Sequence, residues 1–190
     1  MKWMIASDIH GSAKHCREML GRFEEERADR LLLLGDLLYH GPRNDLPEEY
    51  DPKAVTSLLN GVKEKLLCVR GNCEAEVDQM VLDFPVMAEY AILALGANVV
   101  YAAHGHHANE ESPPPLCAGD LLLCGHTHIP KCAAHEGFVY LNPGSVSIPK
   151  AGSDRSYMTF RNGLFQWKRL EDAGVYREYR VGEKAMDRNE

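Results

Sequence analysis

The stretch Trp3-Met4-Ile5-Ala6-Ser7-Asp8-Ile9-His10 begins with four apolar residues and ends with a carboxylate and an imidazole. An apolar run this short favours a buried strand over a helix. Asp8 and His10 have i, i+2 spacing, which in extended backbone sends both side chains to the same side. The stretch therefore predicts a central strand that delivers two polar side chains at its C-terminal end.

The same arrangement recurs along the chain. Further short apolar runs occupy residues 31–34, 66–69, 99–103, 121–124 and 138–141. Polar residues of metal-binding type follow four of these runs: Asp36, Asn72, His104, and His126 together with His128. In α/β sheets, sites form at the carboxyl ends of the strands. We therefore expect all seven polar side chains to meet at one edge of the fold.

Helix-like segments separate the early runs. Ser12 can cap a helix that carries Cys16, Met19 and Phe23 on one face, and residues 52–62 and 74–82 predict two more helices. Strands that alternate with helices indicate an α/β layered fold through about residue 105.

The C-terminal third has a different pattern. Residues 156–161 and 164–170 flank Asn162-Gly163, a strong hairpin signal, and residues 175–181 can form one more strand. We expect two packed sheets with helices outside, the second sheet being richer in antiparallel pairing. Residues 1–181 are predicted to form a single domain, and the charged tail 182–190 is predicted to fray.

Composition narrows the classes of partner and compartment. The net charge of −7 over 190 residues argues against sequence-independent binding to nucleic acid, which needs surplus Lys and Arg. No stretch approaches the roughly 20 apolar residues of a membrane span, and the N-terminal apolar run is too short for a signal peptide. The six cysteines form no CxxC pair. A cytoplasmic protein with reduced thiols is expected.

The seven polar residues combine carboxylate, imidazole and amide donors. This mixed oxygen and nitrogen set suits Mn²⁺, Zn²⁺, iron or Ni²⁺, whereas Ca²⁺ prefers oxygen alone. Asp36 stands in the middle of the set and can bridge two ions. Two ions about 3.5–4 Å apart can hold a hydroxide between them and clamp phosphoryl oxygens. The set needs no cysteine, which argues against a structural zinc site.

Asp-x-His, Gly-Asp, Gly-Asn, His-Gly and Gly-His-x-His, in this order, resemble the motifs of the calcineurin-like metallophosphoesterases. The resemblance covers roughly residues 3–150. Finer features are similar to the YfcE-like phosphodiesterases, and they are Ser7-Asp8-Ile9-His10-Gly11, His40-Gly41-Pro42-Arg43-Asn44, Arg70-Gly71-Asn72-Cys73 and Asn142-Pro143-Gly144-Ser145-Val146.

The resemblance implies a four-layer α/β/β/α sandwich of two mixed sheets flanked by helices. It also implies two metal shells that share Asp36. The first consists of Asp8, His10, Asp36 and His128, and the second of Asp36, Asn72, His104 and His126. Manganese is the expected metal, with Ni²⁺, Zn²⁺, Mg²⁺ or iron as alternatives. The expected reaction is hydrolysis of a small-molecule or nucleotide phosphodiester by a hydroxide that bridges both ions, and a homodimer or higher homo-oligomer is expected.

One position departs from the pattern of many relatives, in which a histidine after the Gly-Asn asparagine protonates the leaving oxygen. Here Cys73 occupies that position, and a thiol forms only weak hydrogen bonds. His40, His106 or His107 can be considered for the acid role. Arg43, in a long loop, can contact a phosphate through two hydrogen bonds. His40, His106 and Arg43 are therefore the candidate substrate-side residues.

Two other functions stay open from the sequence. A phosphomonoesterase would use the same metals, although the missing histidine after Asn72 counts against it. A protein-interaction scaffold of the same fold would bind metal but turn over little substrate. Such a scaffold is free to lose its histidines, and this chain keeps all seven ligand positions filled.

Overall fold

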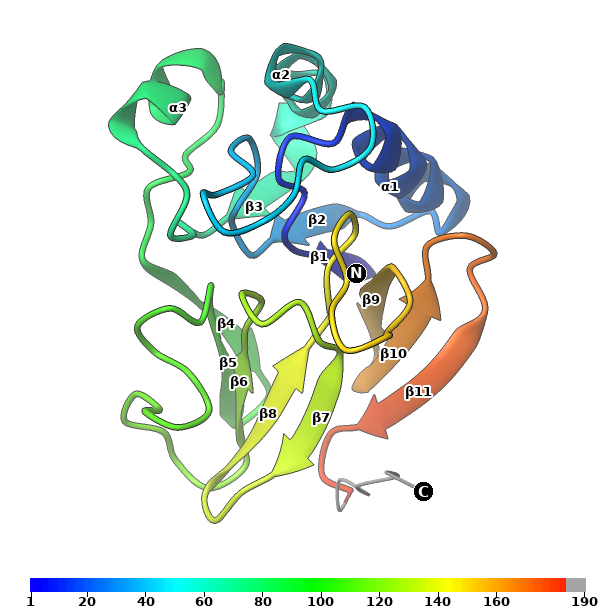
Figure 1. Ribbon diagram of the computed structural model, residues 1–190. Helices are drawn as coiled ribbons and strands as arrows, with labels where there is room; N and C mark the ends of the chain where they lie inside the picture. Colours follow the sequence, from blue (N-terminus) through cyan, green and yellow to red (C-terminus); the bar gives the residue numbers. More distant parts are fainter. Residues whose placement is uncertain (184–190) are drawn as a thin grey trace.

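A computed structural model describes residues 1–183 of the chain. Within these residues two sheets pack face to face (Figure 1). The first sheet has the order β11-β10-β9-β1-β2-β3 and contains β1 (Trp3–Ala6), β2 (Arg30–Leu33), β3 (Leu66–Cys68), β9 (Ser156–Arg161), β10 (Leu164–Arg169) and β11 (Val175–Arg180). The second has the order β4-β5-β6-β8-β7 and contains β4 (Tyr90–Leu95), β5 (Asn98–Ala103), β6 (Asp120–Leu123), β7 (Lys131–Ala134) and β8 (Phe138–Asn142).

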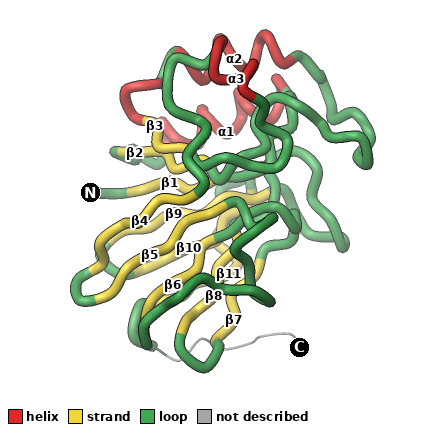
Figure 2. Tube along the Cα trace, turned by 90° about the vertical axis from the view of Figure 1, so that its left-hand side faces the viewer, coloured by secondary structure: helices red, strands yellow, loops and turns green. Residues whose placement is uncertain are grey.

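The helices cover the outer face of the first sheet. They are α1 (Ala13–Glu25), α2 (Pro52–Asn60), the short 3₁₀ helix η1 (Lys63–Lys65) and α3 (Glu76–Val81). In both overall views the helices lie at the top and strands β7 and β8 at the bottom (Figures 1 and 2). As predicted, Ser12 caps α1 by accepting a hydrogen bond from the backbone N–H of His15.

Strands β1 and β2 are buried on both faces, as expected for the centre of a layered fold. Met4 and Leu31 pack with the helices, in a core that includes Met19 of α1. Ile5 and Leu32 pack with the second sheet. Each central strand therefore contributes to two apolar cores.

Trp167 of β10 connects the two sheets through its packing and through a hydrogen bond. Its ring is fully buried in the core between them, and its Nε1–H donates to the carbonyl oxygen of Asn142 at 2.6 Å. Asn142 ends β8 in the second sheet. Trp167 is therefore part of the core between the sheets and connects the two sheets by a hydrogen bond.

The expectation of two packed mixed sheets with helices is confirmed. The layer outside the second sheet, however, is formed by a loop and not by a helix within the described residues. Among residues 1–183 no helix covers that face. Its apolar side chains Leu122, Cys124 and Tyr140 pack instead with Leu116, from the loop between β5 and β6. This loop contains Pro113-Pro114-Pro115, and proline lacks the N–H that a helix interior requires.

The C-terminal strands differ from expectation in where they lie. The predicted hairpin forms, but β9 pairs antiparallel with β1, so β9, β10 and β11 extend the first sheet. Antiparallel pairing is therefore not concentrated in the second sheet. Strands β4 and β7 were not predicted, and both are edge strands of the second sheet. The alternating half-exposed pattern of β4 is a weaker signal than an apolar run.

None of the helices in residues 1–183 is long and apolar enough to cross a membrane. The division into one domain over 1–181 and a fraying tail stays a prediction, and residues 184–190 of that tail lie outside the described residues.

His15 of α1 makes the stability of the fold depend on pH. The ring is buried and lies 2.8 Å from the Ser12 hydroxyl, and burial, followed by the charge of Arg155, lowers its pKa to about 4. The unfolded chain therefore binds more protons than the folded chain between pH 6.5 and about 4. The contribution of His15 to stability should fall as the pH drops through this window and stay level above it.

Between pH 7 and pH 5 the free energy of unfolding should decrease in the natural sequence. We predict that this decrease is about 1–2 kcal/mol smaller in His15→Gln. Urea unfolding of both proteins in EDTA at the two pH values measures the difference. The same pH slope in both proteins would contradict this assignment.

Candidate metal centre

The seven predicted polar residues do meet at one edge of the fold. β1, β2 and β3 run parallel in the first sheet, and β5 and β6 run parallel in the second. The carboxyl ends of these strands are where the seven residues emerge: Asp8, His10, Asp36, Asn72, His104, His126 and His128. Polar atoms of neighbouring side chains lie no more than 3.6 Å apart, and these short distances connect all seven residues.

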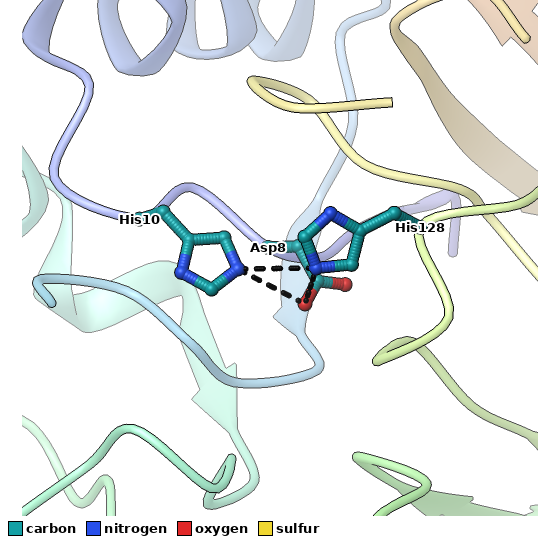
Figure 3. Close-up of side chains that lie close together, drawn as sticks. All are labelled: Asp8, His10 and His128. Carbon is teal, nitrogen blue, oxygen red and sulfur yellow. Dashed lines mark hydrogen bonds and ion pairs between the residues drawn. The ribbon is translucent and has the colours of Figure 1, made fainter. Parts of the chain in front are cut away.

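Asp8, His10 and His128 form one group of this centre (Figure 3). The two Nε2 atoms lie 3.2 Å apart, and Asp8 Oδ1 lies 3.5 Å from that of His10 and 3.3 Å from that of His128. All three side chains are buried. Three ligand-type atoms thus point at one small volume.

His104 is the centre of a second group. Its Nε2 lies 3.1 Å from Asn72 Oδ1 and 3.2 Å from His126 Nδ1. Asp36 joins the two groups, because its Oδ2 lies 3.4 Å from His104 Nε2 and 3.6 Å from His10 Nε2. The predicted middle position of Asp36 in the set is therefore its position in space.

The hydrogen bonds outside the centre orient the imidazole lone pairs towards it. Nδ1 of His10, His104 and His128 lies 2.7–2.8 Å from the carbonyl oxygens of Tyr39, Leu34 and Ile148, respectively. A carbonyl only accepts, so in the neutral rings Nδ1 carries the proton and Nε2 a lone pair. Histidines that ligate metals are oriented in this way.

The Nε2 atoms of His10 and His128 lie 3.2 Å apart, so their lone pairs repel each other unless a cation lies between them. Asp8 Oδ1 shows the same need, because it is buried, makes no hydrogen bond and faces the Nε2 atoms of His10 and His128. A buried carboxylate oxygen is costly unless a positive charge lies beside it. The donor set and this oxygen therefore fit divalent metal ions.

The pKa shifts of the ionisable groups in the centre also indicate that it favours a bound cation. Burial raises the pKa of Asp8, but the neighbouring His10 and His128 rings outweigh burial and hold that pKa well below its usual range. Burial lowers the pKa of His104, but the adjacent Asp36 outweighs burial and raises it to about 9. The carboxylates therefore stabilise a positive charge beside them, either a protonated imidazole or a metal cation, and metal binding should release protons from the imidazoles.

The backbone of the centre is unusual. Five of the seven residues have positive φ: Asp8 (58°), His10 (50°), Asp36 (57°), His126 (64°) and His128 (61°). Such angles cost about 1–3 kcal/mol each in residues other than glycine and cluster at functional sites. The expectation that the i, i+2 pairs lie in extended backbone is therefore wrong. The pairs converge because left-handed residues turn the chain.

Glu74 supports the centre and was missed by sequence reasoning. Its buried carboxylate accepts hydrogen bonds from the backbone N–H groups of Asp36 (2.8 Å), Leu37 (2.6 Å) and Gly71 (2.5 Å). Burial, followed by the Asp36 carboxylate, raises the pKa of Glu74. Glu74 thus fixes the loops that carry Asp36 and Asn72 to each other. Only its position directly after Cys73 gave a signal.

The turn that begins at Asn142 also lies beside the centre. Asn142 Nδ2 donates to the carbonyl oxygen of Gly125 at 2.7 Å, and the hydroxyls of Ser145 and Ser147 donate to that of Asp8 at 2.8 and 2.9 Å. This turn therefore supports the backbone at Asp8 and just before His126.

A polar cleft of about 420 Å³ opens onto the centre. Asp36, Asn72, His126 and His128 line it, together with Arg43 from the long loop and Lys150. Lys150 was not predicted, because an isolated exposed lysine carries no motif. Arg43 and Lys150 bring positive charge to the cleft of an acidic protein.

The other candidate substrate-side residues lie apart from that lining. His40 packs edge-on against Tyr39 and Tyr50, at ring distances of 4.8 and 5.1 Å. The ring of His106 lies 5.4 Å from that of His104, and burial, followed by the charge of His104, lowers its pKa to about 4. A neutral ring at pH 7 is poorly suited to donate a proton.

Cys73, at the position where the family resemblance leads us to expect a histidine, lines the cleft. Its backbone N–H donates to Asp36 Oδ1 at 2.9 Å, and its Sγ accepts from Asn72 Nδ2 at 3.3 Å. Burial, followed by the Asp36 charge, raises the pKa of the Cys73 thiol. The thiol is therefore protonated at neutral pH, and its main visible role is to position Asp36 through the backbone.

Comparison with known proteins extends this description. The model of the calcineurin-like phosphoesterase superfamily domain matches residues 1–162. The chain is 43% identical over 175 residues to the phosphodiesterase YfcE of Escherichia coli strain K12, covering 92% of this chain and 95% of that protein.

Solved structures show the same relationship. The fold is similar to that of Yfce, a phosphoesterase from Escherichia coli, with a TM-score of 0.92 and 42% identity over 95% of this chain and 100% of the other. Vps29 of Entamoeba histolytica, solved in complex with Zn²⁺, has a TM-score of 0.61 and 17% identity over 95% of this chain and 99% of that chain, so it shares the fold alone.

We predict that Glu74→Gln destabilises the metal-free protein by about 2–3 kcal/mol, because hydrogen bonds to a charged group are lost and an amide N–H₂ must face backbone N–H groups. Urea unfolding measures the loss. Glu76→Gln, at an exposed position two residues later, is the matched control and should change little. Equal stabilities of the two variants would show that Glu74 does not hold these loops.

Proposed function

The chain belongs to the calcineurin-like phosphoesterase superfamily, and from this premise we propose that it is a phosphodiesterase that depends on two divalent metal ions. The observation that carries the proposal is the convergence of seven ligand-type side chains, with Asp36 between the two groups. The 43% identity to the phosphodiesterase YfcE supports the choice of a diester.

In this proposal Asp8, His10, Asp36 and His128 hold the first ion, and Asp36, Asn72, His104 and His126 hold the second. Mixed oxygen and nitrogen donors suit Mn²⁺, Ni²⁺, Zn²⁺ or iron. The resemblance to the metallophosphoesterases makes Mn²⁺ our choice, with Ni²⁺, Zn²⁺, Mg²⁺ or iron as alternatives. When bound, the ions supply a hydroxide between them as nucleophile and compensate charge on the phosphoryl oxygens. Three of these residues act in catalysis by holding the two ions in position, and they are Asp36, Asn72 and His104.

The protein groups around the ions have separate tasks. The bonds from His10 and His128 to backbone carbonyls fix the ring orientations. Arg43 and Lys150 in the cleft attract the phosphate and hold it through charge-assisted hydrogen bonds. The substrate is a small-molecule or nucleotide phosphodiester whose phosphate enters this cleft. The expected self-association and the expected cytoplasmic location stay predictions.

The first test is hydrolysis of bis-p-nitrophenyl phosphate, a diester, after loading with Mn²⁺. We expect turnover that exceeds turnover of the corresponding monoester and that disappears in EDTA. Asp36→Asn should lower it by about 10²-fold or more, because the bridging carboxylate is lost. Asp83→Asn, which alters an exposed carboxylate paired with Lys63, is the control.

Each alternative function has its own outcome in this assay. Faster monoester than diester turnover would identify a phosphomonoesterase. An intact diester from pH 6 to 9 with Mn²⁺, Mg²⁺, Ni²⁺ and Zn²⁺ would overturn the enzyme proposal and leave the scaffold.

Cys73 is proposed to be dispensable as a general acid. We predict that Cys73→Ala lowers diester turnover less than tenfold, whereas loss of a general acid typically costs about 10²–10⁴-fold. The reason is that a protonated thiol forms weak hydrogen bonds. Steady-state kinetics with leaving groups of different basicity measure the effect. A loss that grows steeply with leaving-group basicity would assign the acid role to the thiol.

A further inference from the structure

Three metal-competent side chains gather beside the candidate centre without belonging to it. They are Glu89, His106 and His107, and one ligand atom from each lies within 4.8 Å of the others. None of the three belongs to the seven-residue set, and none is needed for the proposed function.

The hairpin of β4 and β5 explains how these residues meet. The two strands pair antiparallel, with Tyr90 opposite Ala103. Glu89 directly precedes β4, and His106 and His107 follow shortly after β5 ends. The register therefore brings the carboxylate and the two imidazoles to the same end of the hairpin.

The two imidazoles lie together although they are neighbours in sequence. Side chains at adjacent positions of extended backbone point to opposite sides. Here the chain bends after Gly105, whose φ of 116° is open to glycine alone, and the rings of His106 and His107 approach to 4.0 Å. A tight bend thus presents two nitrogen ligands to one location.

One of these rings has an unmet bonding requirement. His106 Nδ1 is buried and has no hydrogen-bond partner among residues 1–183. Leaving a buried polar atom unpaired is unfavourable, so such an atom calls for a ligand. Glu89 is better held, because its Oε1 lies 3.1 Å from Arg70 Nη1 in an exposed ion pair. An exposed pair of this kind contributes little and yields readily to a stronger partner.

We propose that Glu89, His106 and His107 form an additional site for a borderline divalent cation such as Zn²⁺ or Ni²⁺. Two imidazoles and one carboxylate are donors that these ions accept, whereas Mg²⁺ and Ca²⁺ prefer oxygen. Three protein ligands leave coordination positions open to water. The site should therefore bind more weakly than the seven-residue centre. It lies next to that centre, since the ring of His106 is 5.4 Å from that of His104.

The experiment counts ions on the full chain. Metal-stripped protein is dialysed against Zn²⁺ at rising free concentration, and bound zinc per chain is measured by mass spectrometry. We expect Glu89→Gln and His107→Gln to bind one ion fewer per chain than the natural sequence at high zinc, with the tighter binding unchanged. His135→Gln is the matched control, because His135 pairs with the Glu110 carboxylate at 2.9 Å without a third ligand.

Asp36→Asn separates this inference from the proposed function. That variant should lose tight binding and keep the weaker ion. If Glu89→Gln, His107→Gln and the natural sequence bind the same amount of zinc at every concentration, the additional site does not exist.

A second measurement needs no variant. Zinc should slow the modification of His107 by diethyl pyrocarbonate at concentrations at which His135 in the same molecule still reacts at its usual rate. Equal rates at His107 with and without zinc would overturn the proposal.

Discussion

The carboxylate of Asp36 lies between two imidazoles that come from different sheets. Its Oδ2 is 3.6 Å from His10 Nε2 and 3.4 Å from His104 Nε2. His10 follows a strand of the first sheet, and His104 follows a strand of the second. The two sheets must therefore be held in one fixed relation for the three groups to meet. The buried Trp167 hydrogen bond to Asn142 helps to fix that relation. The core between the sheets thus serves the centre directly, because it sets the distance across which Asp36 must reach.

At this edge the surrounding structure holds the backbone in a conformation that residues other than glycine rarely adopt. Five of the candidate ligands have positive φ, a conformation that only the surrounding structure can maintain. Glu74 supplies part of this restraint through three backbone N–H groups, and Ser145 and Ser147 supply another part at the carbonyl of Asp8. Strain at the candidate ligands is therefore offset by hydrogen bonds from residues outside the seven-residue set.

The charge of the molecule and the charge of its cleft have opposite signs. The chain carries a net charge of −7, which opposes sequence-independent attraction to a polyanion. Arg43 and Lys150 nevertheless stand at the cleft, and bound ions would add to their charge. A phosphate is then attracted locally, whereas a long polyanion meets an acidic surface. This contrast favours small phosphodiesters over polymers. The Glu89, His106 and His107 cluster lies next to this centre, because the ring of His106 is 5.4 Å from that of His104.

The sequence by itself determined strands β1, β2 and β3, the cap at Ser12, the Asn162-Gly163 hairpin and the identity of the seven side chains. These features depend on local rules, namely apolar runs, capping chemistry and turn preference, which adjacent residues express directly. Only the tertiary structure decided that the hairpin joins the first sheet, that a proline-rich loop covers the second, and that Glu74 and Lys150 serve the centre. Partners such as Glu74 and the backbone of Leu37 are far apart along the chain, and no local pattern records which distant N–H a buried carboxylate will reach. The same holds for the positive φ values, since the chain adopts them only where distant contacts compensate for their cost.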